Sequence, residues 1–381
     1  MLEYILLLII VISSYFATRN YEILCKQLFR IEIILIALFV GCSDMLGGYD
    51  RYIYGEAFDS ISSSIHNGID IRSLSLQAFL WLNEPAYFIW NILIGFITQN
   101  RYIFIFITTL LIYWLIYKSF IANTSNPLFA LILFLGLYFF FTFTYLRQVI
   151  AVAILWNSLA FIEKRQLIRF LSTVLLAAMF HNSAIIFAIM YFIPIRKYNI
   201  LLVFLCFISA LFIGVTGVHS KLFNLFGSLI NNEARTATYE NIKEIRIEYI
   251  IESLLFLFLI FFSYKRIGTD KRQIILLNCS LMFCMVLAFF CTSSDGGRIS
   301  WYFMIGLIAL FSQLYAPGKA VTASGLTLIL MSILLYMRIL IVWGVLIYPY
   351  KTFFTNGIRE GDYIHSENEY DHRYNYDKFY K

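Results

Sequence analysis

Charged side chains are scarce in this chain: Asp, Glu, Lys and Arg make up only 14% of its 381 residues, whereas 61% are hydrophobic. A soluble domain has about a quarter charged residues and about half apolar ones. This composition excludes an ordinary water-soluble fold. The net charge of +6 comes from basic residues in short segments between apolar runs. Such residues orient membrane helices, so this charge does not indicate a nucleic-acid partner.

Several motifs that accompany common enzyme chemistries are also absent. The chain has no Walker A sequence, which argues against direct use of ATP, and no G-x-S-x-G or H-E-x-x-H sequence. None of its six cysteines forms a C-x-x-C pair, so we expect no metal site and no disulfide framework. We expect no cofactor either. Regularly spaced arginines and fixed-period repeats are missing too, which disfavours a voltage sensor and a transporter built from repeats.

Long apolar runs dominate what is present. A helix needs about 20 mostly apolar residues to cross a hydrocarbon core of about 30 Å, and continuous runs favour helices over a β-barrel. The predicted fold class is all-α, a polytopic membrane protein with about 12 transmembrane helices. The first run lacks the basic n-region of a cleaved signal, so we expect it to be retained. The expected spans are 2–18, 31–43, 102–117, 128–145, 148–162, 167–181, 183–194, 199–217, 248–264, 274–291, 299–316 and 321–347.

Charge predicts the orientation of these spans. Basic linkers mark the cytoplasmic side, at 19–30, 163–169, 194–198, 264–272 and 317–319. Loops 44–84 and 218–247 are then external to a single transmembrane domain, 1–347. A polar, tyrosine-rich external tail follows at 348–381, and its sparse aliphatic content after residue 364 favours disorder or loose surface contact. The segment 85–98 is too short to cross comfortably, so we interpret it as re-entrant or interfacial.

Arg147 and Gln148 stand between two apolar runs, in FTFTYLRQVIAVAILW. A charged residue deep in a bilayer costs at least about 2.5 kcal/mol, so its presence there requires a partner or a function. Arginine forms bidentate hydrogen bonds with phosphate oxygens, which makes both residues candidate pyrophosphate ligands. The structural alternative is an arginine whose head group reaches the interface.

His181 belongs to a His-Asn-Ser triplet that interrupts the apolar stretch LAAMFHNSAIIF. We interpret this triplet as a helix break at the external end of the membrane. An imidazole at this point could act as a general base or bind pyrophosphate, or it could simply bond to a carbonyl at the helix end. Two predicted crossings separate Arg147 from His181, so both are expected on the external face.

The stretch SSDGGRISWYF, residues 293–303, forms another candidate cluster. Asp295 is a candidate base and Arg298 a candidate pyrophosphate ligand at a glycine turn that enters a helix. Tyr302 lies four residues after Arg298, on the same helix face, and is a candidate glycan contact. The structural alternative is a turn followed by an interfacial belt of Arg, Trp and Tyr.

The external loop opens with GGYDRYIYGEAF, residues 47–58. Asp50 is a candidate base, and Arg51 and Tyr52 are candidate glycan contacts because aromatic and charged groups suit sugar rings and hydroxyls. Glu84 is a weaker candidate for the same glycan surface. A polar loop resting on the membrane fits this sequence equally well.

Glu252 and Arg338 are charges inside apolar runs, where each is costly unless it is paired or faces water. Glu252 is a candidate base and Arg338 a candidate pyrophosphate ligand. They could equally form a structural ion pair with each other.

The order of these motifs resembles that of the EpsG-like branch of the Wzy-type polysaccharide polymerases. The match is strongest over 147–187. The matching pieces are a G-x-D-R-Y-like stretch at 48–52, Glu-Pro at 84–85, Y-L-R-Q-x-I-A at 145–151, F-H-N-S-A at 180–184 and R-I-x-W-Y-F at 298–303.

This resemblance implies a bacterial plasma-membrane glycosyltransferase that polymerises undecaprenyl-pyrophosphate-linked oligosaccharide units on the outer face. The product would be O-antigen, capsule or exopolysaccharide. The implied partners are the lipid-linked donor and acceptor and the membrane, with room for a flippase and a chain-length regulator. Arg147 and Arg298 would bind the donor pyrophosphate. His181, or an acid such as Asp50, Glu252 or Asp295, would deprotonate the acceptor hydroxyl.

Two other functions fit part of the sequence. A flippase or transporter would use the same basic cavity to hold pyrophosphate during translocation. A membrane O-acyltransferase also places a histidine and an asparagine in the bilayer. Here His181 and Asn182 are adjacent, however, and no second histidine lies in an apolar run.

Overall fold

The structure is a computed structural model that describes residues 1–44, 49–69, 84–218, 245–293, 296–315, 317–318, 322–356 and 373–381. Within these ranges the regular structure is helical, apart from an isolated β-bridge between Ser43 and Thr352. The all-α class is thereby confirmed. Among the described helices, six are long and apolar enough to cross a membrane, and six apolar helices of 10–17 residues accompany them. The expected total of about twelve spans stays a prediction.

The described residues form two compact units. Unit 1 comprises Met1–Asn157, Leu175–Asn182 and Tyr315–Lys381, and unit 2 comprises Ser158–Val174 and Ser183–Leu314. The predicted single domain, 1–347, thus contains two packing units.

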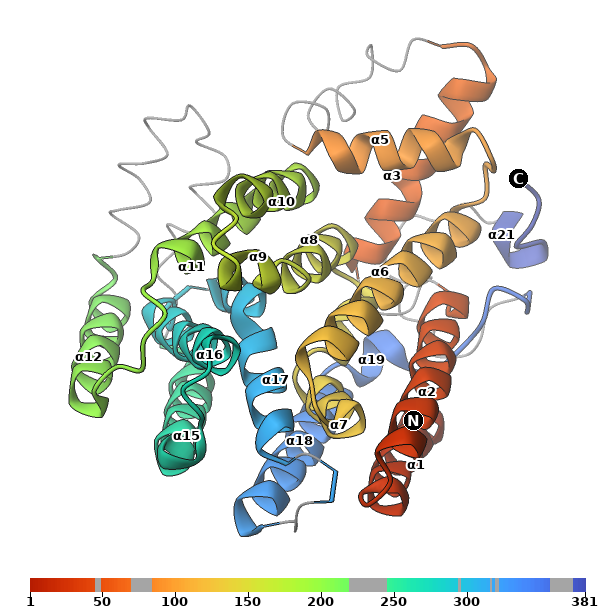
Figure 1. The fold of residues 1–381 in the computed structure, drawn as a ribbon. Helices are drawn as coiled ribbons and strands as arrows, with labels where there is room; N and C mark the ends of the chain where they lie inside the picture. The colour runs from red at the N-terminus through yellow and green to blue at the C-terminus, as the bar shows by residue number, and fades with distance from the viewer. Residues whose placement is uncertain are drawn as a thin grey trace. The chain divides into compact units, whose positions relative to one another are not determined.

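Unit 1 is organised around α7, a helix whose residues are all buried. Helices α1, α2 and α18 pack against α7, while α6 packs between α2 and α8, and α3 packs on α5 and α6 (Figure 1). Helices α7 and α18 approach closely at Gly136, where a β-carbon would lie 2.5 Å from the carbonyl oxygen of Ser332. The elements of unit 1 are α1 (Leu2–Thr18), α2 (Glu22–Cys42), α3 (Tyr49–His66), α5 (Pro85–Gly95), α6 (Arg101–Asn123), α7 (Pro127–Leu137), η2 (Phe139–Phe143), α8 (Leu146–Trp156), α18 (Ala323–Val342), α19 (Gly344–Ile347) and α21 (Arg373–Tyr376).

Unit 2 is organised around α16, against which α9, α12, α15, η5 and α17 all pack. Gly306 of α17 allows a close approach to α16, because a β-carbon there would lie 2.4 Å from the backbone nitrogen of Ser280. Helix α10 (Leu167–Phe180) begins in unit 2 and ends in unit 1. The other elements are α9 (Leu159–Glu163), η3 (Asn182–Ala188), α11 (Ile189–Phe192), α12 (Ile200–Thr216), α15 (Ile247–Ser263), η4 (Tyr264–Arg266), α16 (Lys271–Phe289), η5 (Gly296–Phe303) and α17 (Met304–Leu314).

Apolar side chains cover the outside of these units as well as the core. On α1, Tyr4 and Leu8 are buried, whereas Leu2, Ile9 and Ile10 are exposed. A helix that is apolar on both its buried and its exposed face requires an apolar solvent on the exposed side. The chain is therefore a membrane protein, as its composition predicts.

Several predicted spans are interrupted in the structure. Span 128–145 consists of α7 and the 3₁₀ helix η2, and span 148–162 consists of α8 and α9, separated at Asn157. Helix α2 begins nine residues before the predicted span 31–43, because its first turns carry a solvent-compatible ion pair between Lys26 and Glu22 (2.6 Å). Hydropathy alone does not reveal such a helical extension.

The predicted external loop 44–84 contains helix α3, most of whose side chains are buried although many are polar. A polar loop resting on the membrane is therefore the wrong description of residues 49–66. Residues 70–83 of this loop, and 219–244 of the predicted loop 218–247, lie outside the described residues.

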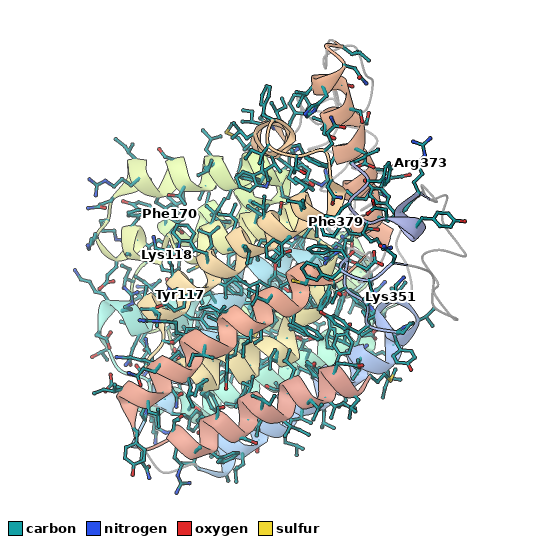
Figure 2. All side chains as sticks on the ribbon, turned by 90° about the vertical axis from the view of Figure 1, so that its right-hand side faces the viewer. Tyr117, Lys118, Phe170, Lys351, Arg373 and Phe379 are labelled. Atoms are coloured by element: carbon teal, nitrogen blue, oxygen red, sulfur yellow. The ribbon has the colours of Figure 1, made fainter. Side chains whose placement is uncertain are left out.

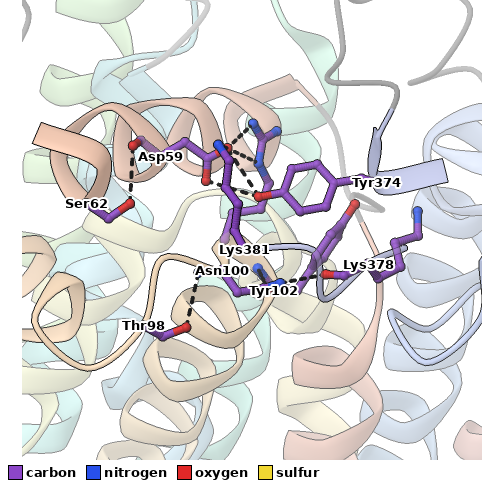
Figure 3. A network of polar contacts seen from close by, with 9 residues as sticks. Asp59, Ser62, Thr98, Asn100, Tyr102, Tyr374, Lys378 and Lys381 are labelled. Carbon is purple, nitrogen blue, oxygen red and sulfur yellow. Dashed lines mark hydrogen bonds and ion pairs between the residues drawn. The ribbon is translucent and has the colours of Figure 1, made fainter. Parts of the chain in front are cut away.

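The end of the C-terminal tail packs onto unit 1, which corrects the expectation of loose contact for residues 373–381. Tyr374 is fully buried, and its hydroxyl lies 3.3 Å from both carboxylate oxygens of Asp59 on α3 (Figure 3). The same carboxylate accepts hydrogen bonds from Arg101 at 2.6 and 3.0 Å and pairs with Lys381 at 3.3 Å. Ion pairs and aromatic contacts, rather than aliphatic burial, hold this segment in place. A hydropathy average does not register either of them.

Candidate functional site

Arg147 and Glu84 meet at the starts of two helices of unit 1. Arg147 is the second residue of α8, and Glu84 is the N-cap residue of α5, directly before Pro85. The guanidinium Nη1 donates a hydrogen bond to the Glu84 carboxylate at 2.5 Å. The Glu84 side chain is 1% exposed and that of Arg147 is 24% exposed. The pair is thus sealed on the carboxylate side and partly open on the arginine side.

Two tyrosines flank the Arg147 guanidinium. Its central carbon lies 5.2 Å from the ring centre of Tyr54 on α3 and 6.0 Å from that of Tyr87 on α5. The two rings meet edge to face, with their centres 5.9 Å apart. Cation–π contacts of this kind hold a guanidinium in one place while its edges stay free for hydrogen bonds. Residues of α3 and α5 thereby fix an arginine of α8.

The N-terminus of α8 adds to the positive potential around Arg147. Its N-cap residue, Tyr145, makes no side-chain hydrogen bond to the first turn. The first N–H groups of an α-helix lack carbonyl partners within the helix, and together with the helix dipole they attract anions. Gln148 follows on the same turn and is buried. An anion placed here would meet backbone N–H groups and a guanidinium together.

One donor of Arg147 remains unused. Its Nε is buried and has no hydrogen-bond partner within the described part of the chain. A buried donor without an acceptor costs about 1–3 kcal/mol. Arg51 and Arg101 each keep one such nitrogen too, so the 24% exposure of the Arg147 side chain is what makes its donors accessible to a ligand oxygen. The Glu84 carboxylate uses one edge of the guanidinium and leaves this donor to an incoming acceptor.

Tyr54 stands beside the pair as a neutral phenol. Burial raises its pKa, as does the nearby Asp50 carboxylate, while the Arg147 guanidinium acts in the opposite direction. The hydroxyl therefore keeps its proton at neutral pH and can donate a hydrogen bond. Asp50 is half-buried at the start of α3.

Arg51 has a structural environment, which corrects its assignment as a glycan contact. Its side chain is fully buried, and it donates hydrogen bonds to the carbonyl oxygens of Val40 (3.1 Å), Ser43 (3.0 Å) and Phe143 (3.1 Å). Burial lowers its pKa to about 10, so it remains charged at neutral pH. Arg51 joins the end of α2 to η2 and does not face a ligand.

Tyr52 is also buried rather than displayed on a surface, with 3% exposure. Its ring centre lies 5.8 Å from the guanidinium of Arg101. This places Tyr52 in the polar network that anchors the tail, so its assignment as a glycan contact is corrected too.

His181 follows the last residue of α10, and the 3₁₀ helix η3 begins at Asn182, so the predicted helix break is confirmed. The backbone N–H of His181 donates to the carbonyl of Ala177 at 3.0 Å and closes the last turn of α10. The imidazole side chain is half-buried. Its role as a base stays a prediction.

Unit 2 holds three of the candidates from the second half of the chain, Glu252, Arg298 and Tyr302. Arg298 is half-buried in η5, and the hydroxyl of Tyr302 lies 2.8 Å from that of Ser183. Glu252 is half-buried on α15. Asp295 lies outside the described residues. The motif F-H-N-S-A thus contacts R-I-x-W-Y-F through Ser183, a residue that was not a predicted ligand.

Arg338 belongs to unit 1 and is exposed on α18. Arg298 and Glu252 belong to unit 2. The expected meeting of Arg147, His181 and Arg298 in one cavity, and the pairing of Glu252 with Arg338, both stay predictions. Within the described ranges, no three His, Cys, Asp or Glu side chains lie where they could hold a metal ion.

Two residues of the Glu84–Arg147 site were not among the predicted ligands. Tyr54 lies four residues after Asp50, and Tyr87 lies three residues after Glu84, so both spacings are helical. Treating 44–84 as a loop hid the first of these relations. An assignment of 49–66 as a helix would have placed Tyr54 on the face of Asp50.

We compared the chain with models of known protein families. The EpsG family model matches residues 26–352, which run from the second turn of α2 to beyond α19 and include both partners of the Glu84–Arg147 pair. The chain belongs to the EpsG family. This membership confirms the resemblance seen in the motifs and associates the chain with a polymerase-like role in polysaccharide biosynthesis. No curated protein and no solved structure matches the chain.

Proposed function

We propose that this EpsG-family protein polymerises undecaprenyl-pyrophosphate-linked oligosaccharide units on the outer face of the bacterial plasma membrane. The observation that carries the proposal is the Glu84–Arg147 pair at the uncapped N-terminus of α8. A permanent cation that is 24% exposed, placed at a helix N-terminus, suits the oxygens of a pyrophosphate. Basic linkers on the opposite side of the spans orient this end outward.

The proposed reaction is a single glycosyl transfer. A hydroxyl oxygen of the acceptor unit attacks the anomeric carbon of the donor glycan, and the bond from that carbon to the undecaprenyl pyrophosphate oxygen breaks. The pyrophosphate leaves with the electron pair, and the hydroxyl proton passes to a base. The growing chain then sits on the new unit, whose own lipid carrier remains attached.

Arg147 acts on the leaving group in this scheme. Negative charge grows on the pyrophosphate as the bond breaks, and a guanidinium fixed by Glu84, Tyr54 and Tyr87 need not reorganise to meet it. Glu84 is a positioning residue whose carboxylate sets the guanidinium plane. The neutral hydroxyl of Tyr54 can donate a hydrogen bond beside the guanidinium, and the buried ring of Tyr87 holds the guanidinium in place.

The other candidates complete the proposal. Gln148, Arg298 and Arg338 are proposed as further pyrophosphate ligands, and Tyr302 as a glycan contact. The proposed bases are His181, Asp50, Glu252 and Asp295. A flippase and a chain-length regulator are proposed as partners in the membrane.

The test uses the full chain, purified into nanodiscs, with a synthetic undecaprenyl-pyrophosphate-linked repeat unit. Product length is read by gel electrophoresis and mass spectrometry. The wild type should make long chains. Arg147→Ala should lower the rate by about 100-fold or more, and Arg147→Lys should not restore it, because an ammonium lacks the planar fork. Arg19→Ala, an exposed arginine after α1, is the control.

Full-length polymer from well-folded Arg147→Ala would refute the proposed role of this residue. A wild-type protein that moves the lipid-linked unit across vesicle membranes without lengthening it would be a flippase. Transfer of a labelled acyl group to the glycan would identify an O-acyltransferase instead.

A further inference from the structure

A cavity of about 290 Å³ lies between α2 and α6 in unit 1, away from the Glu84–Arg147 pair. Four residues of each helix line it. Ile33 and Tyr113 form the buried wall, and the Tyr113 hydroxyl is already satisfied by Thr142 at 2.9 Å. The wall thus offers hydrocarbon and aromatic surface and no free polar group from Tyr113.

The outer rim of this cavity is exposed and apolar. Ile34 and Trp114 are each 53% exposed, and Leu110 is 37% exposed. In a membrane protein these side chains face lipid, so the cavity is a groove that opens sideways into the bilayer. From Arg30 to Ala37 the groove extends along seven residues of α2, or about 10 Å. A groove of this length and chemistry accommodates a stretch of acyl chain.

One end of the groove is basic. Arg30 is part of the lining, and the Nζ of Lys118 lies 4.5 Å from the ring centre of Trp114, another lining residue. Neither cation forms an ion pair with any residue that the structure describes. Lys26, one turn before Arg30, has its charge compensated by Glu22 at 2.6 Å. The charge beside the groove is therefore positive and open to an anion.

This basic end is distant from the polar network of the tail. Lys118 and Arg101 are 17 residues apart on α6, which corresponds to about 26 Å, close to the thickness of a hydrocarbon core. Figure 2 shows Tyr117 and Lys118 at one side of the view, and Lys351, Arg373 and Phe379 at the other. The basic linker 19–30 marks the Arg30 end as cytoplasmic. The groove therefore lies in the inner leaflet, whereas the Glu84–Arg147 pair is proposed for the outer face.

We infer that the α2–α6 groove binds an anionic glycerophospholipid of the inner leaflet, with its phosphate between Arg30 and Lys118. One acyl chain lies along Ile34 and Leu110. Trp114 contacts both the chain and the Lys118 ammonium, as aromatic residues do at membrane interfaces. This site is separate from the proposed glycosyl transfer and holds whether or not that proposal is correct.

The test is native mass spectrometry of the full chain in detergent with added phosphatidylglycerol or phosphatidylcholine of identical acyl chains. The wild type should retain phosphatidylglycerol in preference. Arg30→Gln and Lys118→Gln should each weaken its retention about fivefold and leave phosphatidylcholine unchanged, as expected for the loss of one cation near a lipid phosphate. Lys26→Gln, whose charge is already paired, is the matched control.

A second pair of variants tests the groove itself. Ile34→Trp fills it and should reduce phosphatidylglycerol retention, whereas Leu35→Trp should not, because Leu35 is 56% exposed and is not part of the lining. Equal retention of both lipids by the wild type, or unchanged retention in Arg30→Gln and Ile34→Trp, would overturn the inference. Retention of undecaprenyl phosphate but not phosphatidylglycerol would also overturn it, since the occupant would then be a polyprenyl carrier.

Discussion

Two regions of unit 1 hold arginines away from bulk water, and they differ in how far the guanidinium groups are exposed. Around Arg51 and Arg101, protein groups supply the acceptors: three carbonyls for the first, and the Asp59 carboxylate with the Tyr374 ring for the second. At Arg147, a single carboxylate takes one edge and the side chain is 24% exposed, against 4% for Arg101. Each of the three guanidinium groups keeps one buried nitrogen without a partner in the described residues, so exposure and not the open donor separates them. The first region, which we term the sealed network, joins secondary-structure elements, whereas the Glu84–Arg147 pair leaves capacity for a ligand.

The comparison shows why an arginine in an apolar chain is an ambiguous signal. Insertion cost predicts only that the charge must be compensated. The compensation can come from the fold, as at Arg51, or be left partly to a substrate, as proposed for Arg147. The exposure of the guanidinium side chain distinguishes the two cases, and exposure is not visible in the sequence.

Asp59→Asn should have the largest effect on stability, because it removes the charge that compensates Arg101 while keeping the size of the side chain. Breaking a buried ion pair in this way costs about 3–5 kcal/mol. The thermal unfolding midpoint in detergent should fall, and so should the amount of protein in the membrane. Glu56→Gln, an exposed change on the same helix, is the control. An unchanged midpoint for Asp59→Asn would mean that the sealed network does not stabilise the fold.

Glu84→Gln should reduce polymerisation strongly and stability less, whereas Asp59→Asn mainly reduces stability. The neutral amide no longer fixes the guanidinium plane, and misplacement of a positioned group costs about 100-fold in rate. Arg147 stays partly solvated, so its charge is not stranded. Chain growth and unfolding midpoint are to be measured on the same preparations. Wild-type polymerisation in Glu84→Gln would remove Glu84 as the positioning residue.

Arg51→Met should destabilise the protein by about 2 kcal/mol, since three carbonyl oxygens lose a charged donor while a side chain of similar length keeps the packing. The protein that remains folded should polymerise at the wild-type rate. A selective loss of polymerisation at normal stability would return Arg51 to the list of substrate ligands.

Lys381→Ala should have the smallest effect, less than about 1 kcal/mol, because this lysine is 23% exposed and water and salt screen its pair with Asp59. The difference from wild type in thermal midpoint should shrink as salt is raised. A loss as large as that of Asp59→Asn, insensitive to salt, would show that the terminal lysine belongs to the sealed core of the network.

Much of the fold was predictable because a segment that crosses the bilayer must be a helix of mostly apolar residues. Helix α1 begins and ends at the predicted residues, and α10 ends one residue before the predicted limit at His181. Helix α3 and the packed tail were not predicted, and both failures have one cause. Their burial depends on Asp59, Arg101 and Tyr374 meeting across more than 300 residues of chain, and a hydropathy window samples only neighbours.

The sequence by itself determined the helical membrane class, the family and most helix limits, since hydrocarbon leaves a backbone few ways to satisfy its N–H and C=O groups. It also marked the motifs that hold Glu84 and Arg147. Only the tertiary structure decided that these two side chains pair, that Tyr54 and Tyr87 flank them, and that Arg51 is sealed. These pairings depend on the distances between helices, which local composition does not encode. The cost of inserting a charge into the membrane is similar whichever partner the charge meets, so it cannot identify the partner.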